Sequence, residues 1–151
     1  MNWVAISWCN AGSIFTVNGR NTASDYVDIL DNQLHPLVQI LFPNDAVFQD
    51  DNLPIHSARS VQSWFEEHKD ALQHLPWPAQ SPDRYIIKLL WSALESRVRS
   101  RFPPPSSVKQ VEDVFHEEWY IIPLETMQNL CESLPRRVQA VLQANGGPTP
   151  Y

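Results

Sequence analysis

Clusters of proline decide where regular structure must break along this chain. The sequence has thirteen prolines against four glycines, and they gather around residues 76–78, 103–105 and 148–150. Proline lacks a backbone N–H and disfavours helical conformation in the residue before it, so each cluster predicts a loop or a break between elements. Helices and strands must therefore fit between these clusters.

The segments between the clusters carry the patterns of both strands and helices. Apolar composition typical of strands occurs in residues 3–8, 13–17, 46–49 and 72–77. The first two should pair as a hairpin, and an Asn-Gly turn closes the second. Helical periodicity or capping residues mark residues 22–30, 35–42, 57–65, 81–98, 108–120 and 124–144. Thr22 or Ser24 should cap the first of these helices and Ser57 the third.

This order of elements predicts an α/β fold. Two strands, a helix, a strand, a helix, a strand and then helices fit a mixed sheet flanked by helices, followed by a helical C-terminal tail. We divide the chain into residues 1–101, which hold the sheet, and residues 102–151, a helical extension that packs on it.

Several features bear on where the protein works. No apolar run reaches the roughly 20 residues that span a bilayer, and the N-terminus lacks the layout of a signal peptide. Cys9 and Cys131 fit no metal or redox spacing. We therefore expect a reduced protein of the cytoplasm or nucleus, neither secreted nor bound to a membrane.

The charge balance limits binding to nucleic acid. Eleven basic and seventeen acidic residues give a net charge of −6. Phosphate neutralisation supplies most non-specific affinity for DNA, so strong unaided binding is not expected. The clear basic clusters, residues 97–101 and 136–137, are interpreted as solvated helix ends, where cations are favourable.

The strand at residues 46–49 runs directly into Asp50, Asp51 and Asn52. Strand ends commonly present catalytic groups in α/β folds, and carboxylates are the ligands that magnesium prefers. Taken alone, this acidic stretch also fits an ordinary turn. The histidines at positions 35, 68, 74 and 116 show no metal-ligand spacing and are predicted to be surface or core residues.

Two longer motifs resemble those of the Tc/mariner superfamily of DNA transposases. Residues 48–56, FQDDNLPIH, resemble the family's second-carboxylate motif, and residues 77–91, WPAQSPDRYIIKLLW, resemble its third motif. Residues 3–7 match a further strand of the family. The resemblance implies an RNase H-like fold and a catalytic domain that cuts and joins DNA with Mg²⁺ or Mn²⁺ held by three carboxylates.

The resemblance assigns roles to individual residues. Asp51 matches the second metal-binding carboxylate, while Asp50 matches no obligatory ligand. Asn52 and His56 match motif residues near the site, and Asp83 matches a residue that should cap the following helix. The third carboxylate should lie at Lys88, where a cation replaces the anion. Thirty-six residues separate Asp51 from Lys88, which is close to the family spacing.

The first carboxylate precedes the strand matched by residues 3–7 in the family, so we expect its strand, and the DNA-binding region before it, to be absent. The sequence thus predicts a truncated RNase H-like domain, decayed and inactive, that binds metal unproductively and DNA weakly. The resemblance implies that the protein works in the nucleus. It leaves open whether copies of the chain associate with one another. One alternative is a domesticated, non-catalytic module that binds DNA or protein. Another is an active nuclease that uses Asp50 and Asp51 alone.

Overall fold

A computed structural model describes residues 2–17, 19, 21–43, 46–75, 77, 86–145, 147 and 149. Their contacts group them into two units. The first unit contains the described residues from 17 to 81, and the second contains residues 2–16 and those from 86 onward. The α/β fold class is confirmed, with two strands and several helices in each unit.

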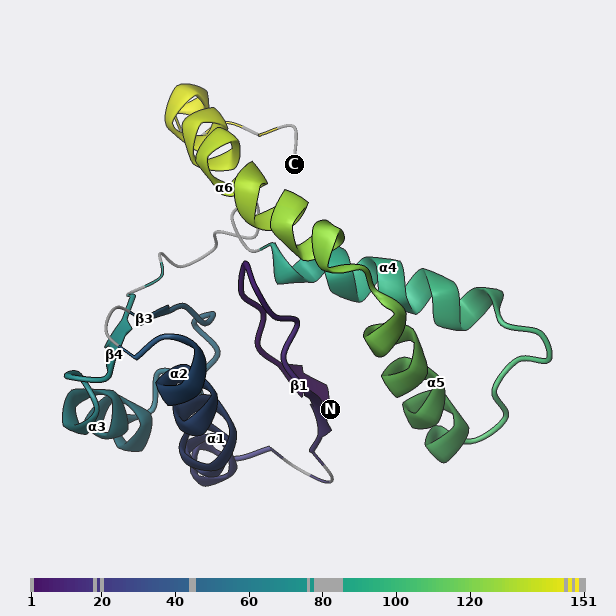
Figure 1. The fold of residues 1–151 in the computed structure, drawn as a ribbon, viewed down its shortest axis with the longest axis horizontal. Coiled ribbons are helices and arrows are strands. Elements are labelled where there is room, and N and C mark those ends of the chain that lie inside the picture. Colours follow the sequence, from purple (N-terminus) through teal and green to yellow (C-terminus); the bar gives the residue numbers. More distant parts are fainter. Residues whose placement is uncertain are drawn as a thin grey trace. The chain divides into compact units, whose positions relative to one another are not determined.

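The first unit begins with one long helical segment. Helix α1 (Ala23–Ile29) passes into a π-helical turn, η1 (Leu30–Leu34), and then into α2 (His35–Leu41) (Figure 1). Of the two residues predicted to cap α1, Thr22 does so. Its Oγ1 accepts a hydrogen bond from the Asp25 backbone N–H, and the Asp25 carboxylate accepts one from the Thr22 backbone N–H. The Thr22 hydroxyl also donates a 2.7 Å bond to the Asp25 carboxylate, and this bond, followed by the bond from the Thr22 backbone N–H, lowers the pKa of the Asp25 carboxyl.

The π-helical turn has a local cause. Pro36 stands in the first turn of α2, and its ring would clash with the carbonyl four residues earlier in a regular helix. The wider turn relieves that crowding, and the His35 backbone N–H bonds to the Leu30 carbonyl, five residues back. The segment that the sequence predicts as two helices is therefore continuous.

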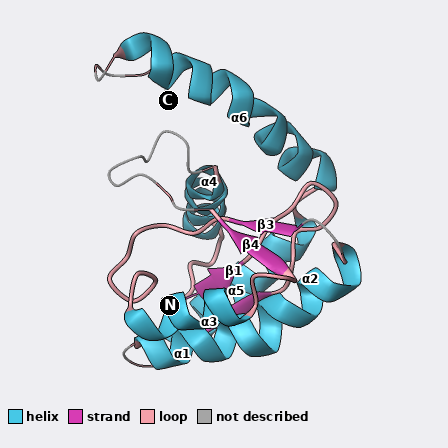
Figure 2. Cartoon of the chain, turned by 90° about the vertical axis from the view of Figure 1, so that its left-hand side faces the viewer, coloured by secondary structure: helices cyan, strands magenta, loops and turns pink. Residues whose placement is uncertain are grey.

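Two short parallel strands complete the first unit. Strand β3 (Ala46–Phe48) pairs with β4 (Leu72–His74), and helix α3 (Arg59–Glu67) connects them (Figure 2). The register sets Phe48 opposite His74. The buried apolar side chains of this unit are Tyr26, Leu30, Leu34, Val38, Val61, Trp64, Phe65 and Leu72. The predicted cap of α3 is wrong: Ala58 occupies the N-cap, and Ser57 Oγ instead bonds to the Leu53 carbonyl.

The second unit opens with the predicted hairpin. Strand β1 (Asn2–Val4) pairs antiparallel with β2 (Ile14–Thr16). Gly12 lies in the connecting loop at φ +58°, and a Cβ atom there would stand 2.3 Å from the Ala5 carbonyl oxygen. Only glycine fits this close approach of two backbone segments.

Three helices follow the hairpin, as predicted. They are α4 (Ile87–Ser100), α5 (Val108–Ile121) and α6 (Leu124–Ala144). Their shared core with the hairpin contains Val4, Ile14, Leu90, Leu94, Trp119 and Met127. The predicted start of α4 at residues 81–83 lies outside the described residues. Asn145 ends α6 in the left-handed conformation that terminates many helices.

Helix α6 joins this core only through its first turns. Met127 is fully buried, whereas Leu142 near the other end is exposed, and Figure 1 shows α6 leading away from the end of α5. The division of the chain at residue 101 stays a prediction. Among the described residues, no helix is both long and apolar enough to cross a membrane.

Candidate active site

The candidate site lies where the parallel strands β3 and β4 end. Asp50 and Asp51 follow β3 after one intervening residue, and His74 is the last residue of β4. Because parallel strands present their carboxyl ends at the same edge of a sheet, these side chains come together. The sequence predicted that Asp51 would stand at a strand end, and the structure places it three residues beyond Phe48, the last residue of β3.

Asp50 is the buried member of the acidic pair. Its Oδ2 accepts a hydrogen bond of 2.7 Å from the Tyr26 hydroxyl, and its Oδ1 lies 2.9 Å from Nε2 of His74. Only 6% of the residue is exposed. With each carboxylate oxygen engaged, Asp50 ties α1 and β4 to the end of β3.

The Asp51 side chain has other partners than Asp50 and is more exposed, at 32% of its surface. Its Oδ1 lies 2.8 Å from Nδ1 of His56 and accepts a 3.2 Å bond from the Leu53 backbone N–H. Since the carboxylate and the nearby Asp51 carbonyl are both acceptors, Nδ1 of His56 carries the ring proton. One oxygen of Asp51 is thus fixed in place by two donors.

The His56 ring is itself held by packing. It is 9% exposed and stacks on Tyr26 with a centroid separation of 4.0 Å. Its Nε2 atom is buried without a hydrogen-bond partner in the part of the chain that the structure describes. Tyr26 therefore serves both acids: its hydroxyl bonds Asp50, and its ring face orients the histidine that bonds Asp51.

The segment after the acids is tied down as well. The Asn52 side-chain amide donates a 2.6 Å bond to the Trp77 carbonyl, which links this segment to the chain beyond β4. Asn52 itself is exposed. The motif residues Asp51, Asn52 and His56 thus lie on one short segment, and their role near a metal site stays a prediction.

The other predicted site residues lie elsewhere in the chain. Lys88 is an exposed residue in the first turn of α4. It belongs to the second unit and Asp51 to the first, so the pairing of Lys88 with Asp51 stays a prediction. Asp83 lies outside the described residues.

The ligand atoms near Asp51 determine which metal ions the site can bind. A half-buried carboxylate with one fixed oxygen fits a single ligand for Mg²⁺ or Mn²⁺. Two cations need several carboxylates, and among the described residues the neighbouring Asp50 is already bonded through both oxygens. The position predicted for the third acid carries Lys88. The described residues therefore do not make up a complete two-metal centre.

Sequence reasoning missed several partners in this unit. Tyr26 was predicted only as part of a helix, and nothing in its spacing to Asp50 signals the hydrogen bond. His74 was predicted to be a surface or core residue, although it contacts Asp50. His35 and His68, predicted likewise, lie with Asp31 in a cluster whose possible ligand atoms are within 4.8 Å of one another.

The chain is similar in sequence to proteins of a known family. Residues 1–111 match the family described as DDE superfamily endonuclease. The chain is 35% identical over 151 residues to the transposase of the transposable element Tcb1 of Caenorhabditis briggsae. It is 33% identical over 153 residues to the Tc1 transposase of Caenorhabditis elegans. Each alignment takes in the whole of this chain, which spans 54% of each of these relatives.

Solved structures share the fold. The catalytic domain of Mos1 mariner transposase superimposes with a TM-score of 0.82 and 21% identity, over 96% of this chain and 73% of that domain. The Mos1 paired-end complex with the left transposon end gives a TM-score of 0.78 at 23% identity, over 95% of this chain and 42% of that one. The predicted RNase H-like fold is confirmed by this likeness.

Proposed function

Because the chain belongs to the DDE superfamily endonucleases, and within them to the Tc/mariner transposases, we propose that it is a transposase catalytic domain whose altered metal site does not cleave DNA. The observation that carries the proposal is the contrast between two motif positions. Asp51 retains the second carboxylate on a fixed loop, while Lys88 replaces the third.

Replacing the third carboxylate by a lysine would weaken metal binding through its charge. In this reaction class, divalent cations activate the attacking oxygen and stabilise the leaving oxygen. A lysine ammonium at a ligand position removes one donor and repels the cations that the remaining acids attract. Structures of the Mos1 catalytic domain described with Mn and with Mg support divalent metal use in the family. Asp51 is the residue of this chain that would contribute to holding such an ion.

DNA is the proposed partner, at low affinity. The Mos1 complexes with transposon ends support DNA as the ligand of this fold. In this chain, however, the basic run of α4 is largely paired with acids: Arg97 and Arg101 contact Glu118, and Arg99 contacts Glu95. Together with the net charge of −6, these pairs leave little positive charge for phosphates. Action on DNA makes the nucleus the proposed location.

A plasmid-nicking assay with Mn²⁺ tests the proposal, with an unrelated metal-dependent nuclease as positive control. We expect no conversion of supercoiled plasmid to open circles above the level of Asp51→Ala. Nicking by the parent chain that Asp51→Ala abolishes would contradict the proposal, because it would show a working metal site despite Lys88.

A further inference from the structure

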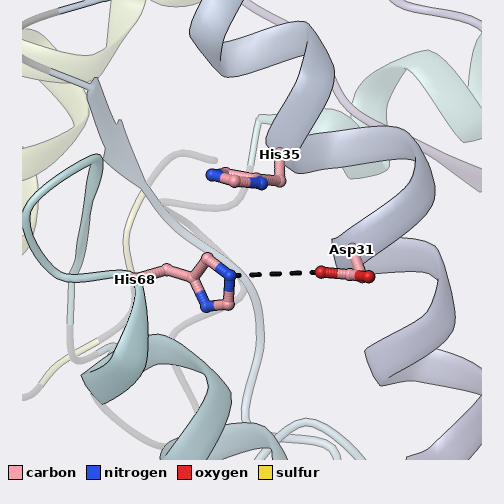
Figure 3. Close-up of side chains that lie close together, drawn as sticks. All are labelled: Asp31, His35 and His68. Carbon is pink, nitrogen blue, oxygen red and sulfur yellow. Dashed lines mark ion pairs between the residues drawn. The ribbon is translucent and has the colours of Figure 1, made fainter.

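Three potential metal ligands meet on the first unit, apart from the acids that follow β3. Asp31 comes from η1, His35 is the first residue of α2, and His68 is the C-cap residue of α3. Figure 3 shows the three side chains converging from two helical segments. One ligand atom from each lies within 4.8 Å of the other two.

The surrounding contacts hold two of these ligands in place. Trp64 stacks on the His68 ring with a centroid separation of 4.1 Å, and its carbonyl lies 2.8 Å from Nδ1 of His68. The Trp64 indole N–H also donates a 3.3 Å bond to Oδ1 of Asp31. Outer partners of this kind orient the ligands in protein metal sites.

The bond to Trp64 decides which atom of His68 faces Asp31. A carbonyl only accepts, so Nδ1 carries the proton and the neutral ring has its lone pair on Nε2. That Nε2 lies 4.0 Å from Oδ1 of Asp31, as the dashed line in Figure 3 marks. When the His68 ring is neutral, two acceptor atoms face each other, with the His35 ring beside them at a centroid distance of 4.7 Å from His68. A cation between them would satisfy both.

We propose that Asp31, His35 and His68 form a binding site for a late first-row divalent metal ion, with zinc as the best-fitting ion. Two imidazoles and one carboxylate are a ligand set that zinc accepts, with a fourth position left for water. Ligand atoms of a tetrahedral zinc site lie about 3.3 Å apart, so the 4.0 Å pair needs to close by less than about 1 Å. The ion would clamp the π-helical turn to the end of α3.

Gln39 supplies a partner for the third ligand. Its amide nitrogen lies 3.2 Å from Nε2 of His35, one helical turn away. Turning this amide by 180° would set its oxygen against Nε2, so that Nε2 carries the ring proton and Nδ1 has the lone pair that binds the ion. The proposal does not depend on the proposed function, because none of these residues belongs to the motifs shared with transposases.

Calorimetric titration of the 151-residue chain with Zn²⁺ tests the site, in an Asp51→Asn background that excludes binding at the candidate active site. Asp31→Asn keeps the shape of the exposed side chain but removes its charge, and His68→Ala removes a ring. Each should weaken zinc affinity at least about tenfold, since even outer partners contribute that much. His116→Ala, which removes a histidine of the second unit, is the matched control and should bind zinc like its parent.

Circular dichroism of the metal-free variants shows whether each one is folded. Asp31→Asn should fold even if His68→Ala does not, so its zinc affinity remains interpretable. Zinc should also raise the melting temperature of the parent more than that of Asp31→Asn. Absence of saturable zinc binding in the Asp51→Asn chain would overturn the proposal. Unchanged affinity in a folded Asp31→Asn variant would do the same.

Discussion

The Tyr26 hydroxyl donates a 2.7 Å hydrogen bond to Oδ2 of Asp50, and both residues are buried, at 0% and 6% exposure. The same tyrosine ring stacks on His56, which bonds the carboxylate of Asp51. One aromatic residue of α1 thus supports two neighbouring acids with different surroundings. It fixes Asp50 directly and Asp51 through the histidine between them.

Removing the Tyr26 hydroxyl should destabilise the fold while leaving the ring in place. In Tyr26→Phe, the buried carboxylate of Asp50 loses one of its two partners, which costs about 1–3 kcal/mol of unfolding free energy. Urea denaturation measures the loss. Tyr120→Phe is the control, because Tyr120 is 66% exposed and should change stability little. Equal unfolding midpoints for Tyr26→Phe and the parent would show that the hydrogen bond contributes nothing.

Two glycines allow a comparison: Gly12 lies in the hairpin loop of the second unit, and Gly19 follows β2 in the first unit. Gly12 and Gly19 both have positive φ, but a Cβ at Gly12 meets the Ala5 carbonyl at 2.3 Å, whereas one at Gly19 meets nothing within 4 Å. Gly19→Ala should cost about 1–2 kcal/mol, the penalty of the left-handed conformation alone. Gly12→Ala should cost more, measured by thermal unfolding, because backbone must also move. The reverse order would contradict the described loop.

The two cysteines should differ in reactivity. Burial raises the pKa of the Cys131 thiol above its ordinary value of 9.0, while Cys9 is exposed. A raised pKa means less thiolate at any given pH, and the thiolate is the reactive form. Iodoacetamide labelling followed by peptide mass spectrometry should therefore modify Cys131 more slowly than Cys9 near neutral pH. Its rate should keep rising with pH beyond 9.0; a plateau below that pH would argue against the burial of the thiol.

Duplex DNA should bind weakly and with strong dependence on salt. The net charge of −6 and the pairing of the arginines in α4 with acids leave few groups for phosphates. Fluorescence anisotropy with a labelled duplex should show binding at low salt that is lost at about 150 mM. A low-nanomolar dissociation constant at that salt, which is typical of specific recognition, would refute this expectation.

Local patterns predicted much of the fold because the relevant physics is local. The apolar spacing of Leu90, Leu94 and Val98 set the buried face of α4, and Thr22 marked the start of α1. The π-helical turn before Pro36 was missed, since periodicity alone does not separate one bent helix from two. The contacts of Tyr26 with Asp50 and of Asp31 with His68 were also missed, because they join residues 24 and 37 positions apart through tertiary packing.

The central proposal is that Lys88 stands at the motif position of the third metal ligand, and Mn²⁺ titration of Lys88→Glu tests it most directly. The control Lys109→Glu makes the same change of charge at an exposed lysine of α5, and an Asp31→Asn background in all proteins excludes the histidine cluster. Lys88→Glu should bind Mn²⁺ at least about tenfold more tightly than the parent, which is ~1.4 kcal/mol, and Asp51→Ala should abolish the gain. Equal affinity of Lys88→Glu and Lys109→Glu would contradict the claim, because Lys88 would then lie away from the site.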